Sequence, residues 1–302
     1  MNSAEHKADQ SIPACPPPDP NPKAPTFDVP PGACDTHAHL FTEADQKRYS
    51  DKRGYTPPVA SLDSFLALHK VLGIERAVLT QPSVYGTDNT AILDAVALHP
   101  DSMRAVAAVG NDVTDQELAR LNDAGVKGVR VNIVDKGGMP FDDIEDVKRF
   151  ADRIAQYGWH VEFLLHAQDF PELRKDFGSM PVDIVVGHLG YMKTSHGLDN
   201  PGFKELIAMA RDGKCWVKLT GSYRITTADA PPYDDVIPYG QALVNEAPDR
   251  MLWGSDWPHP SYYGVMPNDG YLLDQLAHWT SRDAALIKKI LVDNPAALYG
   301  FE

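Results

Sequence analysis

Short runs of apolar and β-branched residues recur along most of the chain, with longer amphipathic segments between them. Eight of these runs are typical of buried strands, and they span residues 33–41, 76–83, 103–110, 127–134, 160–167, 183–190, 215–222 and 251–258. Residues 61–73 predict a helix that Ser61 can cap and Gly73 can end. Residues 141–158 predict another, with acids in its first turn and Gly158 at its end. The pattern therefore alternates strand and helix along the chain.

Eight strand–helix units are the number that closes a (β/α)8 TIM barrel, in which right-handed crossovers join parallel strands. An open doubly wound sheet is the alternative, but it normally carries a glycine-rich phosphate-binding turn after its first strand. Residues 37–45, HAHLFTEAD, contain no glycine. We therefore expect an α/β fold, with a single (β/α)8 TIM-barrel domain over residues 33–302.

The first 32 residues differ in composition from the rest. They contain nine prolines: Pro13, Pro16, Pro17, Pro18, Pro20, Pro22, Pro25, Pro30 and Pro31. Such a segment favours extended or polyproline conformation and excludes a helix or a central strand. It is either a ligand for a proline-recognising domain or, as we favour, an arm that lies over the barrel or a neighbouring subunit. It has no apolar core like that of a secretory signal.

Charge and cysteine content narrow the possible partners. A net charge of -14 at pH 7 over 302 residues argues against nucleic acid and anionic membranes. No apolar run approaches the roughly 18–20 residues that span a bilayer. Cys15, Cys34 and Cys215 form no paired motif, which predicts free thiols in the reducing cytoplasm. We expect a cytoplasmic protein with a small-molecule partner, and a homo-oligomer stays possible.

Polar residues are concentrated where the predicted strands end, which is where such barrels place catalytic groups. They are His37, His39, Arg130, Asn132, His166, His188, Arg224, Asp256 and His259. The other histidines fall in helical, connecting or strand-start positions, and we interpret them as structural: His69, His99, His160, His196 and His278.

The first strand, CDTHAHLF, carries two histidines one residue apart. Side chains alternate along a strand, so Asp35, His37 and His39 are expected on one face, which points into the barrel mouth. Two imidazoles there can hold one metal ion, and a carboxylate such as Asp256 can complete the set. An isolated HxH is a weak signal. Its occurrence together with SDWPH at the last strand favours a functional site.

Several motifs together resemble the amidohydrolase superfamily, and more narrowly its lactone-hydrolysing branch. They are DTHAHLF, GTDN, KGVRVN, GWHV, VVGHLGY, LWGSDWPHP and NPAALYG. The likeness runs from about residue 30 to the C-terminus. It implies a TIM barrel in which water attacks the carbonyl of a cyclic ester and the ring opens.

The resemblance also implies roles for the strand-end residues. Asp256 would be the general base, and His188 would polarise the lactone carbonyl together with the strand-1 histidines. Some members bind one zinc ion, here through His37, His39, His166 and Asp256. Others work without metal. The histidine at position 166 favours zinc, although a solvent-facing or supporting role for it stays open.

Substrate binding is implied residue by residue. Arg130 and Arg224 match positions that hold acidic groups of the lactone, and Tyr55 matches an active-site tyrosine. Lys136 stands at a position where the family has arginine, and Tyr85 at one where it has histidine. Tyr191 likewise replaces an arginine, and His259 is a further candidate at the last strand end.

Because this chain has Lys136 and Tyr191 where the family has arginines, the resemblance favours a muconolactone with one carboxylate and one sulfonate as the substrate. This is a lactone of the 4-sulfomuconolactone type, from the degradation of aromatic compounds. The planar 2-pyrone-4,6-dicarboxylate is the alternative. Other possibilities in the superfamily are a metal-dependent decarboxylase and a sugar-lactone hydrolase or isomerase. A barrel that binds a ligand without turnover would require the His/Asp set to be vestigial, and every position that the chemistry needs is filled.

Overall fold

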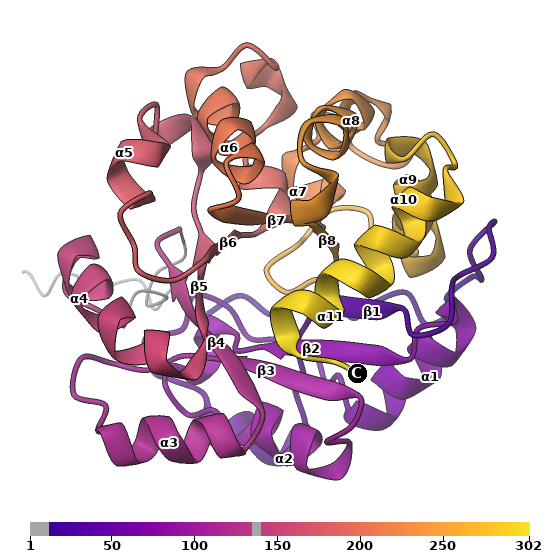
Figure 1. Cartoon of the computed structure of the whole chain (residues 1–302). Coiled ribbons are helices and arrows are strands. Elements are labelled where there is room, and N and C mark those ends of the chain that lie inside the picture. The colour runs from indigo at the N-terminus through magenta and orange to yellow at the C-terminus, as the bar shows by residue number, and fades with distance from the viewer. Residues whose placement is uncertain (1–11, 135–139) are drawn as a thin grey trace, which may run out of the picture.

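The computed structural model describes residues 12–134 and 140–302. Its strands are β1 (Cys34–Ala38), β2 (Arg76–Thr80), β3 (Met103–Ala107), β4 (Val126–Asn132), β5 (His160–Leu164), β6 (Ile184–Val186), β7 (Cys215–Leu219) and β8 (Met251–Trp253). Neighbours pair in parallel in chain order, and the helices lie outside the ring of strands (Figure 1). Each strand coincides with a predicted run, apart from one extra residue at the start of β4. The predicted (β/α)8 barrel is confirmed.

The barrel closes where the ends of β1 and β8 meet. Asp256 N donates to His37 O and His39 N donates to the carbonyl of Trp257, each over 2.8 Å. Gly254 permits this approach, because a Cβ at that position would lie 2.7 Å from the Cβ of His37. Closure therefore places the residues that follow the last strand directly beside those that end the first.

The helices are α1 (Leu62–Leu72), α2 (Thr90–Leu98), α3 (Asp115–Asp123), α4 (Ile144–Ile154), α5 (Leu173–Phe177), α6 (Pro201–Arg211), α7 (Ser222–Ile225), α8 (Ile237–Glu246), α9 (Asp269–Trp279), α10 (Ala284–Lys288) and α11 (Asn294–Tyr299). Ser61 caps α1 by accepting from Ser64 N, and Gly73 ends it in left-handed conformation, as predicted. The helix predicted over 141–158 is shorter than expected. It starts after Asp143, and a single 3-10 turn leads from it to Gly158.

Apolar side chains fill the barrel interior toward the amino ends of the strands. This layer consists of Cys34, Val78, Val106, Val185, Trp216 and Leu252. Tyr299 and Phe301 pack against it, and α11 lies across this end of the ring (Figure 1). A larger cluster fills the space between strands and helices. The base of the barrel is thus filled mainly by apolar side chains.

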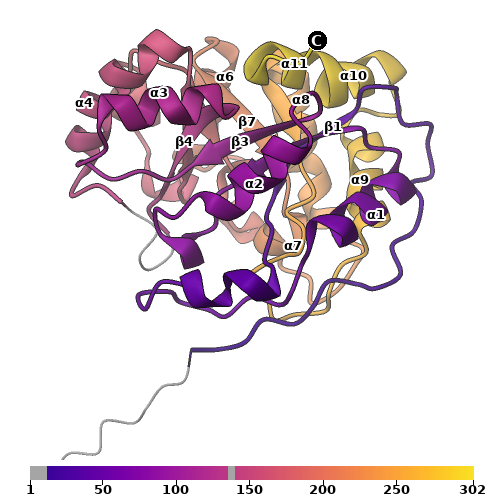
Figure 2. The same cartoon turned by 90° about the horizontal axis from the view of Figure 1, so that it is seen from below.

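The described part of the proline-rich segment forms an extended arm along the outside of the barrel, past α1 and α9 to β1 (Figure 2). Lys23 N donates to Asn268 Oδ1 over 3.0 Å, and Thr26 Oγ1 donates to Asp274 Oδ1 over 2.9 Å. Gly270 lets the arm approach α9, because a Cβ there would lie 2.0 Å from Lys23 O. The described helices include none long and apolar enough to cross a membrane.

Candidate active site

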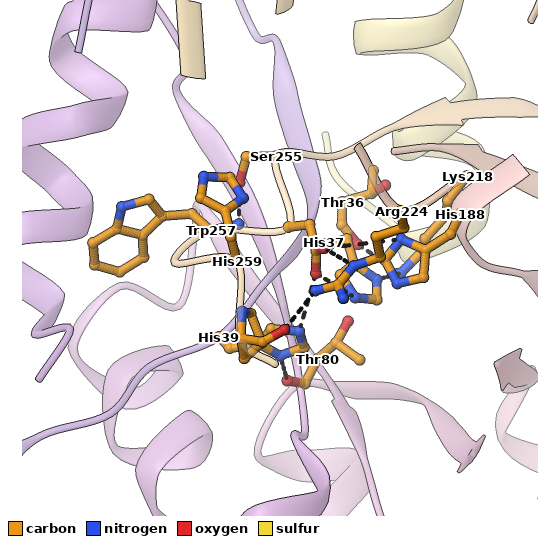
Figure 3. Close-up of polar contacts among 12 residues, drawn as sticks. Thr36, His37, His39, Thr80, His188, Lys218, Arg224, Ser255, Trp257 and His259 are labelled. Atoms are coloured by element: carbon orange, nitrogen blue, oxygen red, sulfur yellow. Dashed lines mark hydrogen bonds and ion pairs between the residues drawn. The ribbon is translucent and has the colours of Figure 1, made fainter. Parts of the chain in front are cut away.

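His37, His39 and Asp256 form a compact buried cluster at the carboxyl ends of the strands. Asp256 Oδ1 lies 3.7 Å from His37 Nε2 and 3.5 Å from His39 Nε2. One ligand atom from each residue can be chosen so that all three lie within 4.8 Å of one another. His188, which follows β6, contributes a fourth polar group, with Nδ1 4.0 Å from Asp256 Oδ2. Three histidines from two strand ends thus lie around one carboxylate. Figure 3 shows the three histidines.

Asp35 does not share this site, which differs from the strand alternation expected for β1. The register of β1 against β2 shifts between Asp35 and Ala38, so an irregularity interrupts the alternation. Asp35 Oδ2 instead accepts from Ser255 Oγ over 2.5 Å and lies 3.3 Å from His69 Nε2 in α1. Its carboxylate therefore ties α1 to the β8 end, while the two histidines that follow face the site.

Hydrogen bonds fix how the strand-1 histidines present their nitrogens. His39 Nδ1 lies 2.7 Å from the carbonyl oxygen of Thr80, which can only accept, so Nδ1 carries the proton and Nε2 keeps a lone pair. His37 Nε2 and Asp256 Oδ1 have no hydrogen-bond partner among the described residues. Two acceptors as close as His39 Nε2 and Asp256 Oδ1 are stabilised by a cation or a donated hydrogen between them. The donor set fits a metal such as zinc.

A buried ion pair supports His37 from inside the barrel. Lys218 Nζ, on β7, donates to Glu162 Oε2 of β5 over 2.5 Å and to Thr36 O over 2.7 Å, and it lies 3.2 Å from His37 Nδ1. Glu162 Oε1 lies 3.3 Å from the same nitrogen. His37 Nδ1 can therefore accept from Lys218, which leaves a proton on Nε2, or donate to Glu162, which frees Nε2 as a ligand. The Lys218–Glu162 pair can therefore support His37 either as a hydrogen-bond donor toward a carbonyl or as a metal ligand.

Asp256 is held through its second oxygen. Arg224 Nε donates to Oδ2 over 2.6 Å, and Tyr223 OH also donates to Oδ2. Tyr223 OH has a single hydrogen, so its 3.0 Å contact with His259 Nδ1 is a bond that the histidine donates. His259 Nε2 in turn lies 3.2 Å from Asp269 Oδ1 at the start of α9. A buried chain of polar groups thus anchors Oδ2 and leaves Oδ1 facing the histidines.

The protonation states follow from burial and neighbouring charge. Burial would by itself raise the pKa of Asp256, but the Arg224 guanidinium outweighs it and holds that pKa well below its usual range. Burial, with the Lys218 ammonium, lowers the pKa of His37 to about 3. Burial likewise lowers the pKa of His39 and places that of His188 well below its usual value. At neutral pH the site therefore holds one carboxylate among three uncharged imidazoles.

A pocket opens over this centre. Its lining residues are His39, Tyr55, Ser83, Arg130, Leu164, His188, Tyr191, Arg224, Asp256, Pro260 and Ser261. Arg130 Nη1 donates to Gln81 O over 3.0 Å, while its Nε has no partner among the described residues. A hollow of about 350 Å³ adjoins the pocket beyond Arg130 and also contains Lys52. A second, of about 280 Å³, adjoins it beyond Arg224 and also contains Lys193. Cationic groups therefore stand on both sides of the reacting centre.

The comparison with known proteins agrees with this geometry. The family model described as amidohydrolase matches residues 34–301. The chain belongs to the amidohydrolase family. It is 38% identical to 2-pyrone-4,6-dicarboxylate hydrolase of Comamonas testosteroni (92% of this chain, 93% of the relative) and 38% identical to 4-sulfomuconolactone hydrolase of Rhizobium radiobacter (97% and 98%). A crystal structure from Agrobacterium tumefaciens superposes with a TM-score of 0.83 at 25% identity, over 92% of this chain and 99% of that one. The two curated relatives are named as hydrolases of cyclic esters, and this chain shares their amidohydrolase family.

Not every candidate residue of this amidohydrolase lines the pocket. His166 lies in the hollow that contains Lys193; its Nδ1 is bonded to Tyr191 O over 2.8 Å, and it is not part of the His37/His39/Asp256 group. Tyr85 is buried and donates to Leu40 O over 3.1 Å. His259 is buried behind Asp256, where it supports Tyr223 rather than facing the pocket. Lys136 lies outside the described residues.

Four side chains that support the amidohydrolase site have no role assigned to them from the sequence. They are Glu162, Lys218, Tyr223 and Asp269. For the first two a signal exists, because a charged residue in the middle of a strand that is otherwise apolar is expected to have a buried partner. Tyr223 and Asp269 carry no such signal. Tyr223 lies in the short helix α7 after β7 and Asp269 begins α9, and the sequence does not reveal the conformation of the loops that place them.

Proposed function

We propose that this amidohydrolase opens the ring of a small anionic lactone, with a muconolactone bearing a carboxylate and a sulfonate, of the 4-sulfomuconolactone type, as its substrate. 2-Pyrone-4,6-dicarboxylate is the alternative. The proposal is carried by one arrangement: an ionised carboxylate and uncharged imidazoles form the floor of a pocket between two guanidinium groups. The two curated relatives, whose names specify these two lactones, support both substrates.

Asp256 is the general base in this mechanism. Its Oδ2 is held by Tyr223 and Arg224, so Oδ1 is the oxygen that can take a proton from water. The low pKa of Asp256 keeps it ionised at neutral pH. The water oxygen bonds to the lactone carbonyl carbon as its proton moves to Asp256. When the tetrahedral intermediate collapses, the ring C–O bond breaks and that proton passes to the departing oxygen.

His188 and its neighbours stabilise the oxyanion. The His188 ring is buried and uncharged, and its Nδ1 has no hydrogen-bond partner among the described residues. A Cβ on Gly221 would lie 2.7 Å from that nitrogen, so glycine leaves the ring its space. A fixed donor aimed at the developing negative charge is worth more in such a water-poor pocket than in solution. In the absence of a bound metal, strand-1 His37 with a proton on Nε2 would be a second such donor.

Zinc is the cofactor we propose, held by His37, His39 and Asp256. The support is the donor set and the facing acceptor atoms of His39 and Asp256. A bound zinc ion acts as a Lewis acid toward water and carbonyl oxygen. Elemental analysis should find about one zinc per chain in the wild type and little in His39→Ala. A metal-free and fully active wild type would instead leave His37 and His188 as the carbonyl polarisers.

Arg130 and Arg224 bind the acidic groups of the substrate in this proposal. Guanidinium matches the planar carboxylate and the three-oxygen sulfonate. Because Arg224 is also bonded to Asp256 and to Pro260 O, it links substrate binding to the position of the base. Tyr55 lines the same pocket and is a further contact. We place the enzyme in the cytoplasm, since its three cysteines are buried free thiols.

The test is a comparison of substrates with purified protein. Ring opening of 4-sulfomuconolactone, 2-pyrone-4,6-dicarboxylate and a neutral sugar lactone is followed by the change in ultraviolet absorbance or by NMR, with carbon dioxide release measured in parallel. We expect the highest kcat/KM for the sulfonated lactone and little turnover of the neutral one. Carbon dioxide release, or preference for the neutral lactone, would contradict the proposal and favour a decarboxylase or a sugar-lactone enzyme.

A further inference from the structure

The proline-rich arm reaches the active-site pocket at its first described residues. Cys15 N donates to Thr56 O and Thr56 N donates to Pro13 O, each over 2.8 Å. Ala14 and Thr56 form a parallel β-bridge at the same place. Tyr55, the residue before Thr56, lines the pocket. Two backbone hydrogen bonds from the arm therefore fix the loop that carries a pocket side chain.

The side chain of Cys15 reaches a second pocket loop. Ser261 N donates to Cys15 Sγ over 3.2 Å, and Tyr263 OH lies 3.7 Å from the same sulfur. Cys15 itself is only 8% exposed, so its thiol is largely buried. Ser261 has a φ of +59°, a left-handed conformation that costs energy for a residue other than glycine. The thiol thus helps hold a strained residue that lines the pocket.

This second loop is bonded to the catalytic carboxylate through one further residue. Pro260, next to Ser261, accepts from Arg224 Nη2 at its carbonyl over 2.8 Å. The Nε of Arg224 donates to Asp256 Oδ2 over 2.6 Å. A continuous path of contacts therefore leads from the arm to Arg224 and the base. A movement of the Ser261 loop would displace the guanidinium that both binds substrate and orients the carboxylate.

We propose that residues 13–15 are a positioning element of the active site, in which the Cys15 thiol holds the Ser261 loop and the backbone of the arm holds the Tyr55 loop. Cys15 acts through these loops and not on the substrate. The inference goes beyond the proposed function. Its kinetic test uses that activity, whereas its exchange test does not.

Three variants distinguish positioning of the pocket loops by Cys15 from general support of the fold by the arm. Cys15→Ala removes the acceptor of the Ser261 amide, whereas Cys15→Ser keeps a small side chain that accepts a hydrogen bond. Thr26→Val is the matched control, because Thr26 ties the same arm to Asp274 in α9, away from the pocket. The readouts are kcat and KM, measured well below the melting temperature of each variant, and amide hydrogen exchange of peptides over residues 255–265.

We expect kcat/KM of Cys15→Ala to fall by about five- to tenfold, mainly through KM, with Cys15→Ser within about twofold of the wild type and Thr26→Val unchanged. Exchange over residues 255–265 should accelerate by about tenfold in Cys15→Ala alone. Unchanged exchange in Cys15→Ala, or equal effects in Thr26→Val, would overturn the inference. A wild type that opens no anionic lactone would refute the proposed function, and the exchange result would still decide the role of the arm.

Discussion

Removing the hydroxyl of Tyr223 tests whether the groups behind Asp256 matter for catalysis. Tyr223→Phe keeps the buried ring and deletes the donor to Asp256 Oδ2, together with the acceptor for His259 Nδ1. A hydrogen bond to a charged acceptor contributes about 1.5–3 kcal/mol. Arg224 still donates to the same oxygen, so the carboxylate stays charged but loses one of two anchors. We therefore expect the free energy of unfolding to fall by about 1.5–3 kcal/mol and kcat by about tenfold, with KM nearly unchanged.

Urea unfolding and steady-state kinetics measure the two effects separately. Tyr239→Phe is the control, because Tyr239 is also buried and donates to Thr194 O over 2.7 Å but does not line the pocket. It should lose stability and keep its kcat. If Tyr223→Phe loses stability while its kcat equals that of the wild type, the hydroxyl only supports the fold, and the assignment of Tyr223 to the positioning of the base is wrong.

Three further results are expected. Glu162→Gln leaves the buried Lys218 ammonium without its carboxylate, so the free energy of unfolding in urea should fall by about 3–5 kcal/mol; no change would mean that the pair is not ionised. Lys193→Met should raise KM about threefold to fivefold for 2-pyrone-4,6-dicarboxylate, which has two anionic groups, and leave KM unchanged for a monomethyl ester of it, which has one; the exposed Lys175→Met should change KM for neither. Burial lowers the pKa of His160 to about 4, so between pH 4 and about pH 6.5 the unfolded chain binds a proton that the folded chain does not, and the free energy of unfolding rises with pH. In His160→Gln this slope should be shallower by up to about 1.4 kcal/mol per pH unit, measured by urea unfolding at several pH values. An unchanged slope would contradict a buried neutral imidazole at position 160.

The fold could be predicted from the sequence because its signals are local. The strand runs differ in period and composition from the helices, and the cap at Ser61 and the stop at Gly73 depend on neighbours a few residues away. Most predicted strands extended too far at their carboxyl ends. These extra residues contribute much of the site, and several adopt left-handed backbone, including His188 and Asp256, which no strand contains.

The candidate site could be predicted as far as barrel geometry alone determines it. His37, His39, His188 and Asp256 converge because parallel strands end on one face. Orientation beyond the strand ends could not be predicted. The irregularity in β1 turns Asp35 toward α1, and the turn after β5 carries His166 into an adjoining hollow. The orientation of such side chains depends on strand irregularities and loop conformations, which leave no periodic pattern in the sequence.

The partners of buried charges were also beyond prediction. Lys218 and Glu162 are 56 residues apart in the chain, and only closure of the barrel brings their strands to face one another. The role of the arm likewise requires the three-dimensional structure, because Cys15 and Ser261 are separated by 246 residues.

The kcat/KM of wild type and Asp256→Asn for 4-sulfomuconolactone and 2-pyrone-4,6-dicarboxylate is the measurement that tests the assigned centre most directly. Asparagine keeps the shape of the side chain and its contacts with Tyr223 and Arg224 in part, but it cannot accept the proton from water. The wild type should open at least one of the two lactones, and the variant should lose about 10³-fold in kcat/KM with an unchanged circular dichroism spectrum. A folded Asp256→Asn protein with activity near that of the wild type would show that the base is elsewhere.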